Sequence, residues 1–256
     1  MAHGGWEVAP TKTKGGLTGR AGPVRPTLPP MKLTYYGHSC FAVESAGHRL
    51  LFDPFISPNP LASHIDLNSI DADFVLITHG HMDHVADAED VLRRTGATVI
   101  SNFEIVSWFQ AMGIDHAHPL NLGGGADFPF GRATYVNAVH SSVLPDGSYG
   151  GNPGGFVIET AEGTFYVSGD TALTTDMKLI AERWQPAFAV LCIGDNFTMG
   201  PRDAAIAAQW VGANRAVGVH YDTFPPIKID HAAASAAFAA LNIELLLPAI
   251  GESIEL

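Results

Sequence analysis

Apolar residues recur along the chain in two spacings, and each spacing predicts a different kind of element. Short runs rich in aromatic and β-branched residues are typical of strands. Such runs lie at residues 32–36, 39–44, 49–52, 74–78, 98–101, 132–140, 156–160, 164–168, 188–193, 216–220 and 244–247. Apolar residues at helical spacing predict helices. These segments lie at residues 85–95, 104–112, 175–184, 203–211 and 231–241.

The order of these elements indicates the fold class. The first three strands follow one another closely and predict a meander, and the turn at Glu162 and Gly163 predicts a hairpin between the strands on either side of it. Behind each group of consecutive strands, helices and strands alternate. Two sheets packed face to face with helices outside account for this order. We therefore expect an α/β protein with a four-layer αββα sandwich over residues 31–256.

The first thirty residues differ from the rest of the chain. They are rich in Gly and Pro, carry four basic residues and have hardly any periodic apolar pattern, which is typical of a disordered leader. No continuous apolar stretch follows the charges, as a secretory signal would need. An organellar transit peptide is the less favoured interpretation, because the segment is not amphipathic. Met31 is a candidate for the functional start.

Composition favours one soluble enzyme-sized domain. The chain has 256 residues, of which 46% are hydrophobic, enough for one substantial core. Its longest apolar runs are far shorter than the roughly 20 residues of a membrane helix. Only two cysteines occur, Cys40 and Cys192, each in a strand-like apolar run. Buried free thiols suit a reducing compartment, so we expect a cytoplasmic protein.

The charge of the predicted domain argues against a nucleic acid as partner. Without the leader, 10 basic and 25 acidic residues remain, a net charge of −15. Binding of a phosphate backbone needs a basic surface stripe. A small-molecule substrate is therefore the expected partner, and a homo-oligomer is left open.

Seven potential metal ligands lie at or just after the ends of four predicted strands. They are His79, His81, Asp83, His84, His140, Asp170 and His220. Strand ends meet at one sheet edge, so we expect these side chains to converge. Neutral imidazoles with a few carboxylates and an open position for water suit a hydrolytic site with two metal ions. A His-rich surface turn without any ligand role is the alternative.

Several motifs also resemble a known family. The stretch ITHGHMDHVAD resembles the signature of the metallo-β-lactamase superfamily, and SGDTAL, IGDNFTMGP and VHYDTFP are similar to one branch, the metal-dependent hydrolases that resemble ascorbate-6-phosphate lactonase. The similarity begins with MKLTYYGHSCF at Met31 and extends nearly to the C-terminus. The resemblance implies the metallo-β-lactamase fold. It also implies that one ion is held by His79, His81 and His140, a second by Asp83, His84 and His220, and that Asp170 bridges them.

The expected activity follows from these ligands. Two divalent ions lower the pKa of a shared water toward neutrality and give a hydroxide nucleophile, which Asp83 can orient. We expect zinc, with manganese, iron and nickel as alternatives. The predicted function is hydrolysis of a small-molecule ester, lactone or phosphoester. The competing hypotheses are a phosphodiesterase or nuclease acting on nucleic acid, and a non-catalytic metal-binding module.

Two residues near the predicted ligands are candidates for supporting roles. His38, in the turn after the first strand, could donate a proton to a leaving group or bind a substrate anion. A solvent-facing turn histidine is an equally good interpretation. Asp53, at the end of the strand LLFDPF, could hold a ligand histidine in one tautomer. The alternative is a turn aspartate before a proline.

Three further residues follow strands that end at the same edge. Asp195 and Asn196 come after strand 188–193 and are expected to line the pocket. Tyr221 follows His220 and either hydrogen-bonds an oxyanion or packs. The Gly-rich loop at residues 141–155 directly follows His140, which indicates a specificity wall or a lid.

Overall fold

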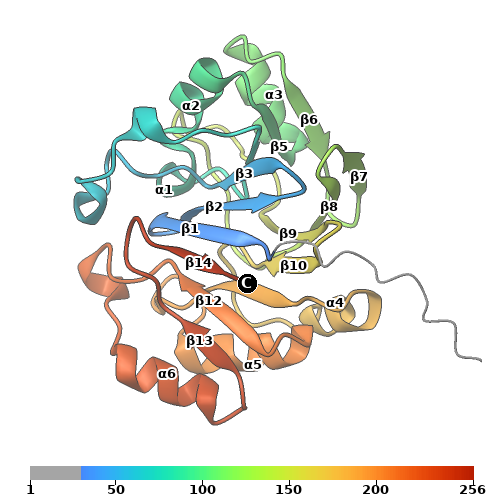
Figure 1. Ribbon diagram of the computed structural model, residues 1–256. Coiled ribbons are helices and arrows are strands. Elements are labelled where there is room, and N and C mark those ends of the chain that lie inside the picture. Colours follow the sequence, from blue (N-terminus) through green and yellow to red (C-terminus); the bar gives the residue numbers. More distant parts are fainter. Residues whose placement is uncertain (1–29) are drawn as a thin grey trace, which may run out of the picture.

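Two seven-stranded sheets pack face to face in the computed structural model of the protein (Figure 1), which describes residues 30–256. The predicted leader at residues 1–30 therefore lies outside the described residues, apart from Pro30. The first sheet contains β1 (Lys32–Gly37), β2 (Cys40–Ser45), β3 (His48–Phe52), β4 (Phe74–Leu76), β5 (Thr98–Asn102), β6 (Ala117–Leu120) and β14 (Ser253–Glu255). The second contains β7 (Gly125–Phe128), β8 (Gly131–Asn137), β9 (Gly154–Glu159), β10 (Thr164–Val167), β11 (Phe188–Cys192), β12 (Arg215–Val219) and β13 (Glu244–Leu246).

Helices cover the outer face of each sheet. Figure 1 shows α2 and α3 beyond the first sheet and α5 and α6 beyond the second, so the four layers run helix, sheet, sheet, helix. The α-helices of the described residues are α1 (Met82–Val85), α2 (Ala88–Thr95), α3 (Phe103–Ala111), α4 (Met177–Arg183), α5 (Pro201–Val211) and α6 (His231–Ala239). The expected αββα sandwich is confirmed. None of these helices combines the length and apolar character that a bilayer-crossing segment needs.

The two sheets have the same internal order. Strands run antiparallel from β14 through β1 and β2 to β3, and parallel from β3 to β6. In the second sheet, β7 to β10 are antiparallel and β10 to β13 are parallel. The antiparallel part of the first sheet contains the predicted meander, β1 to β3, and that of the second contains the predicted hairpin, β9 and β10. The parallel half needs helical crossovers, which explains why helices and strands alternate there.

The core forms two layers because the apolar strands have two buried faces. Along β4 and just beyond it, Phe74 and Leu76 point between the sheets, whereas Val75 and Ile77 pack under the helices. This alternation is the two-residue period of a strand. Large aromatic side chains such as Phe52, Phe156 and Phe165 fill the space between the sheets.

The structure differs from the predicted elements in three respects. Strands β6, β7 and β14 were not predicted. The helix predicted at residues 85–95 is two helices, α1 and α2, separated around Asp87. The strand predicted at residues 132–140 ends at Asn137, so His140 lies in the following loop. Both cysteines are buried and unpaired, as expected.

Candidate metal centre

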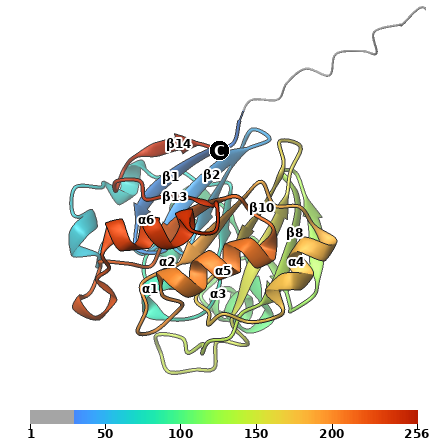
Figure 2. The same ribbon diagram turned by 90° about the horizontal axis from the view of Figure 1, so that it is seen from below.

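All seven predicted ligands lie at one end of the two sheets. Four of them come from α1 and the turn before it, which follow β4, and the other three from segments that follow β8, β10 and β12. Figure 2 shows α1 at the end of the sheets opposite the C-terminus. The two sheets therefore contribute to one centre from both sides. Their side chains form two groups, joined by a third that consists of His79, His84 and Asp170, and the ligand atoms within each group lie within 4.8 Å of one another.

One group consists of three histidines. The Nε2 atom of His79 lies 2.9 Å from Nδ1 of His81, and His140 completes the group. His79 is fully buried, whereas His81 and His140 are partly exposed. The Gly80 backbone N–H donates to Ser142 Oγ at 3.0 Å, which fixes the turn between the first two histidines. These three imidazoles are the set that the family resemblance assigned to one ion.

Asp170 lies between this group and the next. Its Oδ2 atom is 4.0 Å from Nε2 of His79 and 3.7 Å from Nε2 of His140. The same oxygen is 3.4 Å from Nε2 of His84 and 2.9 Å from Nε2 of His220. The Asp170 side chain is almost completely buried. One carboxylate oxygen thus lies within 4.0 Å of four imidazole nitrogens.

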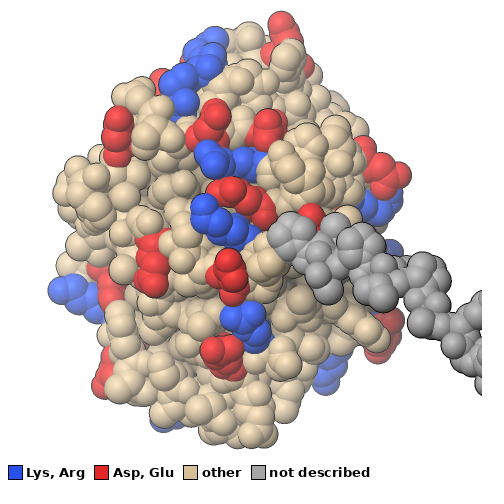
Figure 3. Space-filling view, in the orientation of Figure 1, with Lys and Arg blue, Asp and Glu red and all other residues tan. Residues whose placement is uncertain are grey.

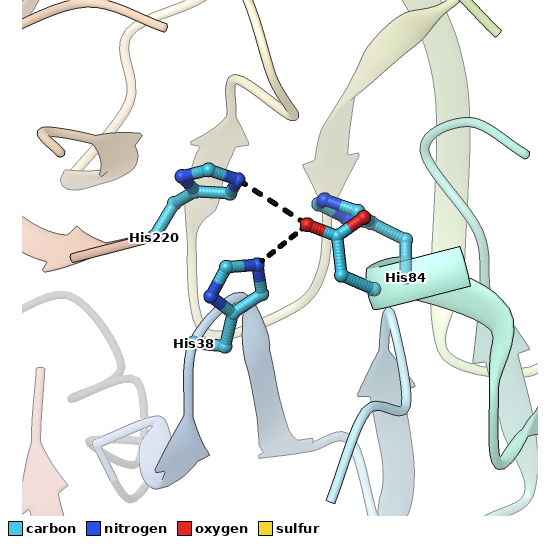
Figure 4. A group of neighbouring side chains, drawn as sticks. His38, His84 and His220 are labelled. Atoms are coloured by element: carbon cyan, nitrogen blue, oxygen red, sulfur yellow. Dashed lines mark hydrogen bonds and ion pairs between the residues drawn. The ribbon is translucent and has the colours of Figure 1, made fainter. Parts of the chain in front are cut away.

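The other group contains Asp83, His84 and His220, together with His38. Oδ2 of Asp83 lies 3.7 Å from Nε2 of His220 and 3.0 Å from Nε2 of His38, and Figure 4 shows both rings pointing toward it. The side chain of Asp83 is 28% exposed, whereas the three imidazoles are buried. Asp83 is therefore the member of this group that solvent or a substrate can reach.

Asp53 binds the ring of His84 on the side away from the centre. Its Oδ2 accepts hydrogen bonds from His84 Nδ1 at 2.8 Å and from Thr78 Oγ1 at 2.7 Å, and its Oδ1 accepts one from the Thr78 backbone N–H at 2.8 Å. A carboxylate can only accept, so the proton of His84 lies on Nδ1 and Nε2 faces the centre. This is the arrangement proposed for Asp53 from the sequence.

His38 is buried between aromatic rings and the centre. The rings of Phe55 and Phe224 lie 5.3 and 5.5 Å from it, and its Nδ1 is 2.9 Å from Thr223 Oγ1. Burial lowers the pKa of His38 to about 4 in spite of the hydrogen bond to Asp83. A neutral ring then donates through Nε2 to Asp83 and accepts at Nδ1 from Thr223. The solvent-facing alternative is wrong for this residue.

Burial and neighbouring charges explain the pKa shifts of His79, His220 and Asp170. Burial and the neighbouring His84 hold the pKa of His79 well below its ordinary value. Burial also opposes charge on His220, but Asp170 outweighs it and raises the pKa of His220 to about 9. Burial likewise disfavours the Asp170 carboxylate, yet His220 and His84 hold its pKa well below the usual range. The carboxylate of Asp170 and the imidazoles around it thus stabilise each other's charged forms.

The donor set fits metal ions. In the described part of the chain, the buried side-chain polar atoms without a hydrogen-bond partner are Asn59 Nδ2, His84 Nε2, Asp170 Oδ1 and His220 Nδ1. Three of them belong to residues of the centre, and of these His84 Nε2 faces it, Asp170 Oδ1 is the second oxygen of the central carboxylate, and His220 Nδ1 is the ring nitrogen other than the one near Asp170. An unpaired buried polar atom costs about 1–3 kcal/mol. A cation bound by the imidazole nitrogens and carboxylate oxygens would remove this cost.

Backbone strain is concentrated around the centre. His38, Asp53 and His220 have φ angles of 54, 42 and 57°, in the left-handed region that non-glycine residues rarely adopt. The His220 N–H donates to the His38 carbonyl at 2.8 Å and joins the two sheets there. Such strain persists only when surrounding contacts enforce it. The centre is thus held by the fold rather than by local preference.

Three predicted residues are not brought into the two groups. Asp195 and Asn196 are exposed, and Asp195 Oδ1 accepts from the backbone N–H of Asn196 at 2.8 Å rather than from a ligand. Tyr221 is buried, with its ring stacked on Tyr35 at 6.4 Å between centroids. The packing alternative describes Tyr221 better. Both Asp195 and Asn196 nevertheless lie beyond β11, at the same end of the sheets.

Sequence reasoning missed the hydroxyl groups that position the centre. Thr78 contacts both Asp53 and His79, Ser142 binds the Gly80 turn, and Thr223 contacts His38. Thr78 directly precedes the first ligand, which is a signal that could have been used. Ser142 and Thr223 are 62 and 185 residues from their partners in the chain, so no local pattern identifies them.

Comparisons of the sequence with known proteins give a consistent result. Residues 48–221 match the beta-lactamase superfamily domain. A UPF0173 metal-dependent hydrolase of Flavobacterium johnsoniae is 49% identical over 226 residues, which cover 88% of this chain and 100% of that protein. A metal-dependent hydrolase of Methanopyrus kandleri is 41% identical over 230 residues, with 88% and 100% covered.

Comparisons of the structure agree with those of the sequence. A metallo hydrolase from the hyperthermophilic archaeon Ignicoccus hospitalis superposes with a TM-score of 0.80 at 34% identity, over 88% of this chain and 98% of that one. An isothiocyanate hydrolase from Delia radicum gut bacteria superposes with a TM-score of 0.68 over 88% of this chain and 99% of that one, at 20% identity. The second likeness concerns the fold alone.

Proposed function

We infer the activity from a premise that the comparisons establish: the chain belongs to the beta-lactamase superfamily and is one of its metal-dependent hydrolases. It is therefore an enzyme that needs a metal. The number of ions, their identity and the bond that is cleaved are the matters on which we make proposals.

We propose a centre for two divalent ions. His79, His81 and His140 would hold one, and Asp83, His84 and His220 the other, with Asp170 between them. The observation that carries this proposal is the position of Asp170 Oδ2, within 4.0 Å of imidazole nitrogens from both groups. Zinc remains the first expectation for such a set of imidazoles and carboxylates, with manganese, iron and nickel as alternatives.

The protein's own side chains suit hydrolysis at this centre. When bound, the ions would supply Lewis acidity and a water of lowered pKa. Asp83 is partly exposed and aims a carboxylate oxygen at the centre, so it can accept a proton from a nucleophilic water or orient it. His38, kept neutral by burial, donates to that same oxygen and fixes its direction. His38 acts through Asp83 in this scheme and is a positioning residue.

The substrate we propose is a small molecule with an ester, lactone or phosphoester bond. All three offer a carbonyl or phosphoryl oxygen whose developing charge two cations can neutralise. The centre opens to solvent through Asp83, His81 and His140, the ligands that are not fully buried. A substrate approaching from that side would meet the two groups of ligands together.

Metal analysis with a matched pair of variants tests the two-ion proposal. The purified wild-type chain, loaded with zinc or manganese and freed of excess ion, is expected to carry about two ions per chain. His79→Ala should lose at least one ion, and hydrolysis of aryl esters, lactones and aryl phosphodiesters should fall by about 100-fold or more.

His116→Ala is the control, because His116 is exposed and contacts the Gly96 carbonyl rather than the centre. It should keep both the ion content and the activity. One ion per fully active wild-type chain would refute the two-ion arrangement, and undiminished hydrolysis by His79→Ala would refute the assigned ligands.

A further inference from the structure

Large apolar side chains are exposed chiefly around the candidate metal centre. Among the described residues, the large hydrophobic side chains that are exposed are Leu61, Met82, Phe103, Val139, Val143, Tyr149, Leu179 and Phe197. Four of them, Met82, Val139, Val143 and Tyr149, lie on the segments that carry or follow the ligands, and Phe197 lies on the loop after β11. We call these five the apolar rim. Exposed apolar groups that gather at one place mark a binding surface, whereas scattered ones do not.

The position of the rim follows from the backbone contacts of its members. Met82 lies between the ligands His81 and Asp83, and Val139 directly precedes His140. Val143 and Tyr149 form an isolated antiparallel bridge in the loop after His140. That loop approaches the Gly80 turn so closely that a Cβ atom on Gly80 would lie 3.1 Å from the Leu144 side chain. These four residues therefore lie on segments next to His79, His81 and His140.

Phe197 lies on the loop after β11, which belongs to the same sheet as β8. The loop that carries it is joined to Thr171, next to Asp170, by the hydrogen bond from Met199 N–H to the Thr171 carbonyl at 3.0 Å. The Val139 N–H donates to Oγ1 of the same threonine at 2.9 Å. Thr171 thus connects the Val139 segment with the Phe197 loop. The rim thus extends from α1 to the loops after β8 and β11.

The rim lacks positive charge. No Lys or Arg occurs at residues 79–86, 138–155 or 194–200, nor in the segments that supply His38, Asp53, Asp170 and His220, at residues 37–40, 53–60, 168–176 and 220–225. A phosphate or carboxylate group on the substrate, away from the reacting bond, would find no cationic side chain on these segments. The same segments carry Asp83, Asp146 and Asp195, which are all at least partly exposed. Arg202 and Lys228 lie nearby only on the side of Asp195, where they line one hollow with it.

The opposite end of the strands has a different surface. There Lys32 pairs with Glu44 at 3.1 Å, and Arg49 pairs with the same carboxylate at 3.4 Å. Figure 3 shows Lys and Arg side chains interspersed with Asp and Glu on the face it presents. The absence of Lys and Arg from the rim segments is thus a property of the metal-centre end and not of the whole surface.

We propose that the apolar rim binds the non-reacting part of the substrate, and that this part is uncharged and apolar, an alkyl or aryl group on an ester or lactone. The proposal rests on the proposed hydrolase function and narrows it, because it disfavours phosphorylated substrates. Each methylene group that the rim removes from water should tighten binding by about twofold to fourfold. A second copy of this chain covering the rim is the rival occupant.

A series of alkyl hydroxamates tests the rim without requiring turnover. Hydroxamates bind divalent ions, so acetohydroxamate, butyrohydroxamate, hexanohydroxamate and octanohydroxamate differ only in the part that would contact the rim. Calorimetric titration of the zinc-loaded full chain should show Kd falling by about twofold to fourfold per methylene. The same titration of a hydroxamate with a terminal phosphonate should show no gain over acetohydroxamate.

Two variants test whether the chain-length dependence of Kd comes from the rim or from exposed apolar side chains elsewhere. The double variant Tyr149→Ser with Phe197→Ser removes two exposed rings and should flatten the chain-length series. Leu179→Ser removes an equally exposed apolar side chain on α4, away from the centre, and should keep the wild-type series. A flat series in the wild type, or a wild-type slope in the double variant, would overturn the proposal.

The remaining outcomes are also decisive. A wild-type dimer in sedimentation that the double variant abolishes, together with a flat series, would assign the rim to a second copy and overturn our proposal. A full chain-length slope in a zinc-loaded protein that cleaves no ester or lactone would support the rim while refuting the proposed hydrolysis. Ester cleavage with a flat series would refute the rim alone.

Discussion

Asp53 connects the end of β3 to the metal centre through a single side chain. Both of its oxygens are used, one shared by His84 and Thr78 and the other bound to the Thr78 backbone. Its own φ of 42° shows that the backbone bends to deliver the carboxylate there. The residue does not face the centre itself, yet it decides which nitrogen of His84 does.

Replacing Asp53 with Asn should therefore weaken metal binding. The amide has one acceptor oxygen where the carboxylate has two, so its NH2 would oppose either the Nδ1 proton of His84 or the Thr78 backbone N–H. Both orientations weaken the contacts that direct Nε2 of His84 at an ion. We expect Asp53→Asn to lower metal affinity by about 10- to 100-fold, measured by competition with a chromophoric chelator.

Asp87→Asn is a matched control for this loss. Asp87 is also a buried carboxylate that accepts backbone hydrogen bonds, from Ile56 and Ser57, but it contacts no ligand. It should lower the free energy of unfolding and leave metal affinity close to that of the wild type. Equal affinities for the Asp53 variant and the wild type would show that Asp53 does not control the tautomer of His84.

The ligands of the centre could be predicted from the sequence, but the burial and backbone conformation that position them could not. Ligands such as His79 and Asp83 were found because they follow strand ends, which hydrophobic patterns locate. His38 was ambiguous, because burial by Phe55 and Phe224 depends on segments far away in the chain. A left-handed φ at a histidine also has no sequence signature, since distant contacts enforce it.

At the scale of elements, the strands that the sequence did not reveal are all at sheet edges. β14 and β6 form the two edges of the first sheet, and β7 is an edge of the second. An edge strand has one neighbour and less apolar burial, so its sequence needs no alternating apolar pattern. Residues 117–120 even contain Pro119, which an edge tolerates and a central strand does not.

Asn102 links the first turn of α3 with the loop at residues 141–155. Its Oδ1 accepts from the Ile105 backbone N–H at 2.9 Å and caps the helix. Its Nδ2 donates to the carbonyls of Gly150 at 2.7 Å and Asn152 at 3.2 Å. One buried amide thus fixes both the helix and the loop that carries part of the apolar rim.

Asn102→Asp should separate these two contributions. An aspartate keeps the capping oxygen but loses both N–H donors. The carbonyls of Gly150 and Asn152 then each lose one hydrogen bond and keep only those from Ser142 Oγ and the Tyr135 hydroxyl. We expect the free energy of unfolding in urea to fall by about 1–3 kcal/mol. Limited proteolysis should also cleave the loop at residues 141–155 faster than in the wild type.

The alanine variant completes the comparison. Asn102→Ala loses the cap as well, and its free energy of unfolding should fall by roughly 1 kcal/mol more than the loss of the two amide hydrogen bonds alone explains. If Asn102→Asp unfolds at the wild-type urea concentration and its loop resists protease equally, the amide donors contribute nothing to the loop.

At the scale of the whole molecule, the centre joins the two sheets. His79, Asp83 and His84 extend from the first sheet, whereas Asp170 and His220 extend from the second. The hydrogen bond from His220 N–H to the His38 carbonyl is a direct link between them at this end. An ion held by ligands from both sides would add a second link that the unfolded chain lacks.

Removal of metal should consequently lower the thermal stability of the entire domain. An ion at 100 times its Kd stabilises the folded state by about 2.7 kcal/mol, and for a domain of this size each kcal/mol shifts Tm by about 2–4 °C. We expect Tm of the zinc-loaded protein to fall by at least about 5 °C after dialysis against EDTA, measured by differential scanning calorimetry, and to recover when zinc is returned. His79→Ala should respond less, because it has already lost a ligand. An unchanged Tm in a chain shown to have carried and released its ions would mean that the sheets are held together at this end without them.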